Sequence, residues 1–337
     1  MENGKDQAGG YFRDLFINDE GELRSGWRAF AFYAVLVVVS FALGNLVVIV
    51  IALASGVESL PLQPQPTAPA SDLTILVTAT VSIIQLASAL IASAICARAL
   101  ERRSLASVGF KLHRGWLSDF LYGSLGGGAA LALAVALAAA ASTIGIDAQH
   151  SSPSTLAANF LVLLITFLIA AAFEELILRG FPFQALAHNI GPLAALAITS
   201  ILFGLLHYQN PNSTLLSTFN TILAGVWLGA AYLKTRSLWL ATALHYSWNL
   251  VMVFVFGLPV SGITMYSHLA WLRSYPKEPA WISGGSYGPE GGLAATIALV
   301  ISTLVIWKVG LFPASEEMMA AIRHGPKEGP QDQKITS

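Results

Sequence analysis

The chain has 337 residues, of which 55 % are hydrophobic and only 11 % are charged, and its formal net charge is −1. Ordinary soluble proteins carry about 25 % charged residues. This low content of charged residues cannot cover a water-exposed surface of this size. We therefore expect the chain to be surrounded by lipid. The near-zero net charge excludes a global basic field that would recruit nucleic acid. The single cysteine, Cys96, excludes a disulfide framework.

Eight long apolar runs predict transmembrane helices, because a helix needs about 20 mostly apolar residues to cross the hydrocarbon. Barrel strands would instead form alternating segments of about 10 residues. The first run is too long for the core of a signal peptide, so we expect it to be retained. The expected fold class is therefore all-α, a polytopic membrane bundle of about eight helices. The runs are 29–54, 73–97, 117–143, 156–178, 192–208, 214–233, 238–257 and 292–311.

The basic residues predict the orientation of this bundle, because cytoplasmic segments carry an excess of Lys and Arg. With an inner N-terminus and eight crossings, every basic residue except Arg273 and Lys277 falls on the inner side. We therefore expect both termini in the cytoplasm. The expected organisation is a tail over 1–28, membrane helices over 29–155, a core over 156–257, an outer loop over 258–291, a last membrane helix over 292–311 and a tail over 312–337.

Four ionisable side chains lie well inside the apolar runs, namely Glu174, Glu175, His207 and His245. An acidic residue at mid-membrane costs about 2.5–3.5 kcal/mol on insertion scales. Two adjacent carboxylates in such a run are therefore expected to pack inward and to have a function. The plainer alternative is that both acids merely pair with positive groups.

The two carboxylates cannot point the same way, because neighbouring helical residues differ by about 100° around the axis. Glu175 and Arg179 are four residues apart, on one face and in the favourable acid-then-base order. We expect these two to form a buried pair. Glu174 then points elsewhere without a local counter-charge, and a carboxylate in a partly wet apolar cavity is suited to act as a base.

Each membrane histidine has a partner one helical turn away. Phe203 shares a face with His207, and Asn249 shares a face with His245. The imidazole of His245 and the amide of Asn249 suit a donor pair for an oxyanion. The alternatives are a hydrogen-bonded packing histidine for His207 and an interhelical hydrogen-bond clasp for the other pair.

Spacing supports a shared site but leaves its depth open. Glu174 lies 16 residues before position 190 and His207 lies 16 after position 191, so a turn there would make them level in an antiparallel pair. The inner turn before residue 238 puts His245 about 12 Å into the membrane, whereas a simple count of crossings puts His207 nearer the outer side. Both hold only if the hairpins are offset or if 208–213 dips inward, which irregular backbone does where it lines a cavity.

Three segments together resemble the ordered motifs of the CPBP family: Glu174–Arg179 (EELILR), Phe203–His207 (FGLLH) and His245–Asn249 (HYSWN). This family includes type II CAAX prenyl endopeptidases and bacteriocin-processing or lysostaphin-resistance-type intramembrane proteases. Every position of the EExxxR, FxxxH and HxxxN patterns is matched, within about residues 156–257. Each motif alone is weak, but their order in successive apolar helices is specific.

The resemblance implies an intramembrane peptidase in which Glu174 and His207 activate the hydrolytic water, while His245 and Asn249 stabilise the oxyanion. The second acid of the first motif, its arginine and the phenylalanine of the second would support the site. Members are often labelled metalloproteases, and Glu174, His207 and His245 would suffice as zinc ligands. We favour a scheme without metal or other cofactor, because the oxyanion role fully uses His245.

The implied substrate is a membrane-embedded or lipidated peptide, of which a prenylated CAAX-type protein is one example, and the expected location is the bacterial cell membrane. Two other functions stay open. A non-catalytic membrane scaffold or bacteriocin-immunity-type protein would use the same residues for structure. A proton-coupled transporter would use the acids and histidines as a proton relay.

Overall fold

The computed structural model describes residues 14–18, 21–55, 65–308, 310 and 312–323. Much of the predicted tail over 1–28 and the end of the predicted tail over 312–337 lie outside these residues. The helices are α2 (Ser25–Ser55), α3 (Asp72–Glu101), α4 (Trp116–Ala140), α5 (Pro153–Arg179), α6 (Phe181–Ile190), α7 (Pro192–Leu206), α8 (Leu215–Thr235), α9 (Leu238–Leu250), α10 (Ala280–Ser283), α11 (Leu293–Lys308) and α12 (Glu316–Arg323).

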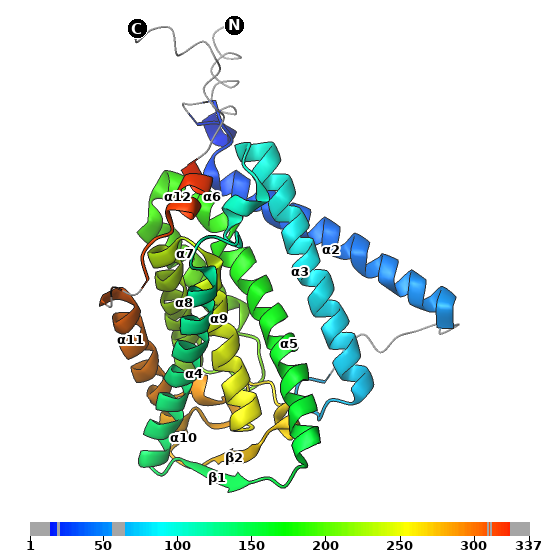
Figure 1. Ribbon diagram of the computed structural model, residues 1–337, viewed down its shortest axis with the longest axis vertical. Helices are drawn as coiled ribbons and strands as arrows, with labels where there is room; N and C mark the ends of the chain where they lie inside the picture. The colour runs from blue at the N-terminus through cyan, green and yellow to red at the C-terminus, as the bar shows by residue number, and fades with distance from the viewer. Residues whose placement is uncertain (1–13, 19–20, 56–64, 309, 311, 324–337) are drawn as a thin grey trace, which may run out of the picture.

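The prediction of a polytopic helical membrane bundle is confirmed (Figure 1). Within the described residues, six helices are long and apolar enough to span a membrane: α2, α3, α4, α5 with α6, α8, and α9 with its continuation to Val255. Two predicted spans form shorter apolar helices, α7 and α11. The bundle is therefore built from long spanning helices with two shorter ones among them.

The two ends of the bundle differ in structure. One end carries α6, α12 and the start of α2 (Figure 1). At this end Lys111, in the loop between α3 and α4, forms an ion pair with Glu317 of α12 at 3.4 Å. The opposite end carries a small antiparallel sheet of β1 (Ile144–Ala148) and β2 (Leu272–Pro276), which the sequence patterns did not predict. The sheet ties the chain after α4 to the predicted outer loop.

The helix after the first motif changes direction at Gly180. The α5 helix ends at Arg179 and α6 begins at Phe181, with Pro182 in its first turn, where proline is tolerated because that N–H needs no intrahelical partner. The α2 helix attaches here: the Tyr33 hydroxyl donates to the Ile177 carbonyl at 2.9 Å, and the Phe32 and Phe181 rings stack at 5.9 Å. Beyond this attachment, α2 leans away from the bundle (Figure 1).

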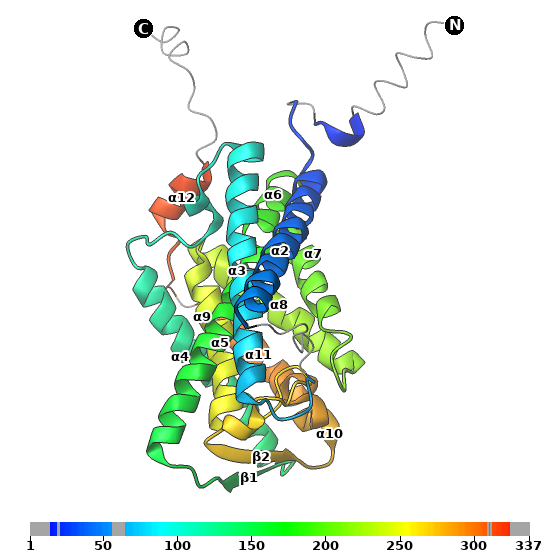
Figure 2. The same cartoon turned by 90° about the vertical axis from the view of Figure 1, so that its right-hand side faces the viewer.

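The α7 helix is only 15 residues long, or about 22 Å at 1.5 Å per residue. It packs beside α8, on the side of the bundle away from α4 (Figure 2). His207 caps its C-terminus, and the chain between His207 and Leu215 is not helical. The expectation that the chain over 208–213 lines a cavity agrees with the structure at Asn210, which belongs to the wall of a cavity together with His207 and His245.

The α4 helix packs closely along α9 because it presents small residues to it. A Cβ atom added at Gly127 would clash with the carbonyl oxygen of Leu244 and the hydroxyl of Ser247, and one at Gly123 would lie 2.6 Å from the Cβ of Ala243. Small residues let helix backbones approach in membranes, where apolar burial provides little drive for association. This contact fixes α9, the helix that carries His245 and Asn249.

Replacing Gly127 by Ala is expected to lower the stability of the detergent-solubilised protein by about 1–3 kcal/mol, because overpacking forces the backbones apart. The measurement is thermal unfolding followed by tryptophan fluorescence. Gly44→Ala in α2 is the matched control, since a Cβ there meets no atom within 4 Å. Equal melting temperatures for the two variants would contradict the role of the α4–α9 contact.

Candidate active site

Glu175 is the centre of a fully buried group of charges. Its side chain and that of Arg179 are both 0 % exposed, and Arg179 Nη1 donates to Glu175 Oε1 at 3.0 Å. Arg179 Nη2 donates to the Gly225 carbonyl of α8 at 3.0 Å. The same carboxylate oxygen accepts from His245 Nδ1 at 3.0 Å. Glu175 thus connects α5 to α9, and Arg179 connects α5 to α8.

The bond between Glu175 and His245 was not predicted. It joins side chains 70 residues apart in the chain, and no local spacing signals it, because it depends on how α5 packs against α9. Its consequence is chemical. A carboxylate paired with arginine only accepts hydrogen bonds, so Nδ1 of His245 carries a proton, and Nε2 of the ring faces Glu174.

His207 is held in the same tautomer by a different partner. Its Nδ1 lies 2.8 Å from the Phe203 carbonyl oxygen, and a carbonyl can only accept, so Nδ1 donates and Nε2 is free. The ring of Phe203 contacts those of His207 and His245 edge to face, at centroid distances of 4.8 and 5.8 Å. The Arg179 guanidinium lies 4.9 Å from the Phe203 ring centroid. Phe203 therefore fills the space between the three groups.

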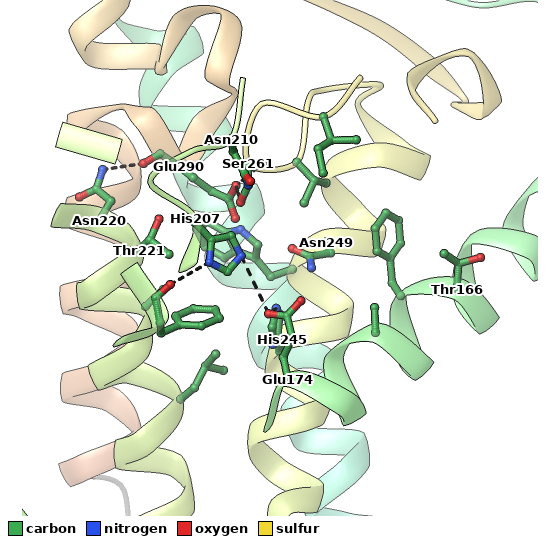
Figure 3. Close-up of a pocket in the computed structure, with 18 of the residues that line it drawn as sticks. Thr166, Glu174, His207, Asn210, Asn220, Thr221, His245, Asn249, Ser261 and Glu290 are labelled. Atoms are coloured by element: carbon green, nitrogen blue, oxygen red, sulfur yellow. Dashed lines mark hydrogen bonds and ion pairs between the residues drawn. The ribbon is translucent and has the colours of Figure 1, made fainter. Parts of the chain in front are cut away.

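Glu174 faces the two imidazoles. Its Oε2 lies 3.8 Å from His245 Nε2 and 4.0 Å from His207 Nε2, and the side chain is 29 % exposed. The Oε2 atom itself is buried and has no hydrogen-bond partner among the described residues. Figure 3 shows the three groups around one point. The gaps are too long for direct hydrogen bonds and suit a small polar guest that bonds to all three.

These groups line a cavity of about 200 Å³. Asn249, one helical turn after His245, lines the same cavity (Figure 3). The structure thus brings together the four residues that sequence reasoning selected as catalytic. One part of the wall is apolar and comprises Phe167, Trp227, Leu228, Trp248 and Leu299.

Another part of the wall is polar and contains residues that sequence reasoning missed, among them Ser261 and Glu290. Glu290 Oε2 accepts from the backbone N–H of Ser261 at 2.6 Å and from its hydroxyl at 2.8 Å. The Asn220 amide donates to the Glu290 carbonyl at 2.9 Å. The predicted outer loop over 258–291 therefore contributes part of the cavity wall, although no motif marks these residues.

The alternative zinc site has suitable atoms at slightly long separations. Zinc ligands at about 2.0–2.2 Å from the ion lie roughly 3.3–3.6 Å from one another in a tetrahedral site. The separations of Glu174 Oε2 from the two Nε2 atoms, 3.8 and 4.0 Å, exceed this range. In the part of the chain that the structure describes, no group of three or more His, Cys, Asp or Glu side chains meets the geometry of a metal site.

Comparison with known protein families identifies one segment of the chain. Residues 155–251 match the family model described as type II CAAX prenyl endopeptidase Rce1-like. The segment includes all three motifs, so the resemblance inferred from them is confirmed there. Neither the curated proteins nor the solved structures give a match. The match and the six candidate spans together indicate an integral, multi-pass membrane protein with a segment similar to an endopeptidase family.

Removing the buried arginine is expected to destabilise the protein strongly. Arg179→Ala leaves the Glu175 carboxylate buried without its counter-charge, which costs about 3–5 kcal/mol. The measurement is thermal unfolding in a neutral detergent. Arg114→Ala is the control, since among the described residues this exposed arginine makes hydrogen bonds only through its backbone N–H and carbonyl oxygen. Equal melting temperatures for Arg179→Ala and the control would contradict the claim that the Glu175–Arg179 pair stabilises the protein.

Proposed function

Because residues 155–251 match the model of the Rce1-like endopeptidase family, we propose that this protein is an intramembrane endopeptidase. It hydrolyses a peptide bond of a membrane-bound, lipidated substrate, with a prenylated CAAX-type protein as the preferred class. The observation that carries the proposal is the buried Glu174 Oε2, which lies within 4.0 Å of two imidazole Nε2 atoms and has no hydrogen-bond partner in the described part of the chain. A membrane protein keeps such a group in lipid only at a cost, and intramembrane ionisable residues mark functional sites.

The lone pairs around this point suit the activation of water. A water molecule there can donate one hydrogen to Glu174 Oε2 and the other to His207 Nε2, whose Nδ1 already donates to the Phe203 carbonyl. Both hydrogen bonds raise electron density on the water oxygen. As that oxygen attacks the scissile carbonyl carbon, its proton passes to Glu174, and Glu174 then transfers it to the nitrogen of the departing amine.

The charge that develops on the carbonyl oxygen needs donors, and Asn249 and His245 are placed to supply them. The Asn249 amide donates without any change of state. His245 donates from Nε2 in the imidazolium form, which takes its second proton from solvent before the substrate binds, and the Glu175 carboxylate on its Nδ1 favours this form. Glu175 and Arg179 act through His245, so we regard them as positioning residues. Donors of this kind contribute about 2.7–4 kcal/mol each in other hydrolases.

The walls of the cavity fit a substrate that arrives from the bilayer. Its apolar part is lined by aromatic side chains such as Phe167 and Trp248. Its polar part, near Asn220 and Glu290, offers hydrogen-bonding groups for the peptide. A lipidated peptide has both kinds of surface. This match supports the substrate class, which the family description also names.

The base assignment has a direct test in the conservative variant Glu174→Gln. Gln cannot accept the proton, so turnover should fall by about 10²–10⁴-fold, while the melting temperature stays near that of the wild type. The assay follows cleavage of a farnesylated CAAX peptide in liposomes, with the same peptide lacking the farnesyl group as the comparison. Glu290→Gln, which alters the other acid of the cavity, should keep most of the turnover. Unchanged turnover in Glu174→Gln would refute the assignment.

Chelation separates the metal-free scheme from zinc. We expect the purified protein to contain zinc far below one equivalent and to keep its peptidase activity after incubation with 1,10-phenanthroline, because Glu174 and His207 alone suffice to activate water. Elemental analysis and the same peptide assay provide the measurements. Loss of activity that added Zn²⁺ restores, and added Mg²⁺ does not, would replace the proposed scheme by one with Glu174, His207 and His245 as zinc ligands.

A further inference from the structure

A second cavity, of about 520 Å³, lies at the end of the bundle that carries α6 and α12. Its walls come from the segments around the start of α2, the end of α3, α6, the end of α8 and α12. It shares no lining residue with the cavity of Glu174. This is also the end where the basic residues between α3 and α4 lie, which the orientation rule assigns to the cytoplasm.

Three arginines line this cavity, together with two glutamates. Arg28 pairs with Glu22 and Glu101, and Arg103 pairs with the other oxygen of Glu101. The two acids are therefore already used by two of the arginines. The third, Arg236, has no hydrogen bond, ion pair or ring contact through its guanidinium among the described residues. The cavity thus carries an uncompensated positive charge.

Arg236 occupies a backbone position that disfavours it. It ends α8 in the left-handed conformation, with φ 58° and ψ 19°. Glycine is the usual residue at such a helix end, because a Cβ is strained there. Arg236 is half-buried in the wall of the cavity and its guanidinium has no partner among the described residues, so it is available to bind a ligand.

The rest of the wall suits an anionic group attached to a less polar body. Arg103 keeps N–H groups beyond those directed to Glu101 and Gln184. The α7 helix starts in the wall at Pro192, and Gly191 provides no side-chain cap, so the positive end of its dipole is uncovered. Phe183 and Ile322 add apolar surface.

We propose that this cavity binds the phosphate group of an anionic molecule, with Arg236 as its principal contact and Arg103 as the second. The headgroup of an anionic phospholipid in the inner leaflet is the first source. Basic pockets between transmembrane helices at the cytoplasmic side are known to bind such headgroups. Arginine suits the role because its planar fork of donors matches phosphate oxygens. The site does not depend on the peptidase proposal.

The test measures lipid retention by the full-length protein. Wild type, Arg236→Gln and Arg98→Gln are purified in neutral detergent and exposed to equal amounts of phosphatidylglycerol and phosphatidylcholine, and native mass spectrometry counts the bound lipids. Arg98 is the matched control, because it is an exposed arginine near the same end of α3 and lies outside the cavity. A parallel arm measures the melting temperature with millimolar inorganic phosphate.

The wild type should retain phosphatidylglycerol over phosphatidylcholine. Arg236→Gln should weaken this binding about fivefold, the factor that corresponds to about 1 kcal/mol per basic residue, and Arg98→Gln should not. Arg236→Lys, which keeps the charge, should retain more than Arg236→Gln and serves if the glutamine variant fails to fold. Stabilisation by inorganic phosphate that Arg236→Gln abolishes, without lipid preference, would assign the site to a soluble phosphate. Equal losses in Arg236→Gln and Arg98→Gln, or no response to either probe, would overturn the proposal.

Discussion

The hydrogen bonds of one buried carboxylate hold this structure together. Glu175 accepts from Arg179 and from His245, and Arg179 reaches the backbone of α8. A charge buried in a membrane protein is tolerated only when it is paired and hydrogen-bonded. These bonds therefore favour a single packing register of α5, α8 and α9. The same bonds leave the Nε2 atom of His245 free to face Glu174, so the fold and the proposed chemistry depend on one contact.

Close packing makes that register achievable. Gly123 and Gly127 let α4 approach the backbone of α9, and Phe203 fills the volume between the two imidazoles. Neither contribution carries charge, yet both limit how the charged groups can move. The C-terminal end of α7 holds Phe203 and His207 close to Glu174, and the irregular backbone after it lines the same cavity through Asn210.

The sequence predicted the helical bundle and the four residues at the cavity because both leave local signals. Apolar length predicts a membrane helix, and Glu174, His207 and His245 stand out as ionisable groups in apolar runs. The Glu175–Arg179 pair follows from its spacing of four residues. The bond from Glu175 to His245, the pairing of β1 with β2, and the position of Glu290 depend on how distant segments pack. Nothing in the local pattern around Glu290 distinguishes it from a solvated loop acid.

The turn that contains Ser261 is held by the Glu290 carboxylate, and Gly262 packs against the carbonyl of Pro211 with φ 82°. This contact joins the chain after α7 to the chain after α9 and thus helps to fix the position of one wall of the cavity. Substitutions in this contact would change the shape of the cavity without altering the helices or the group formed by Glu174, His207 and His245. Differences in the ligands that the cavity accepts can therefore arise in these loops, where mutations are tolerated more readily than in the membrane helices.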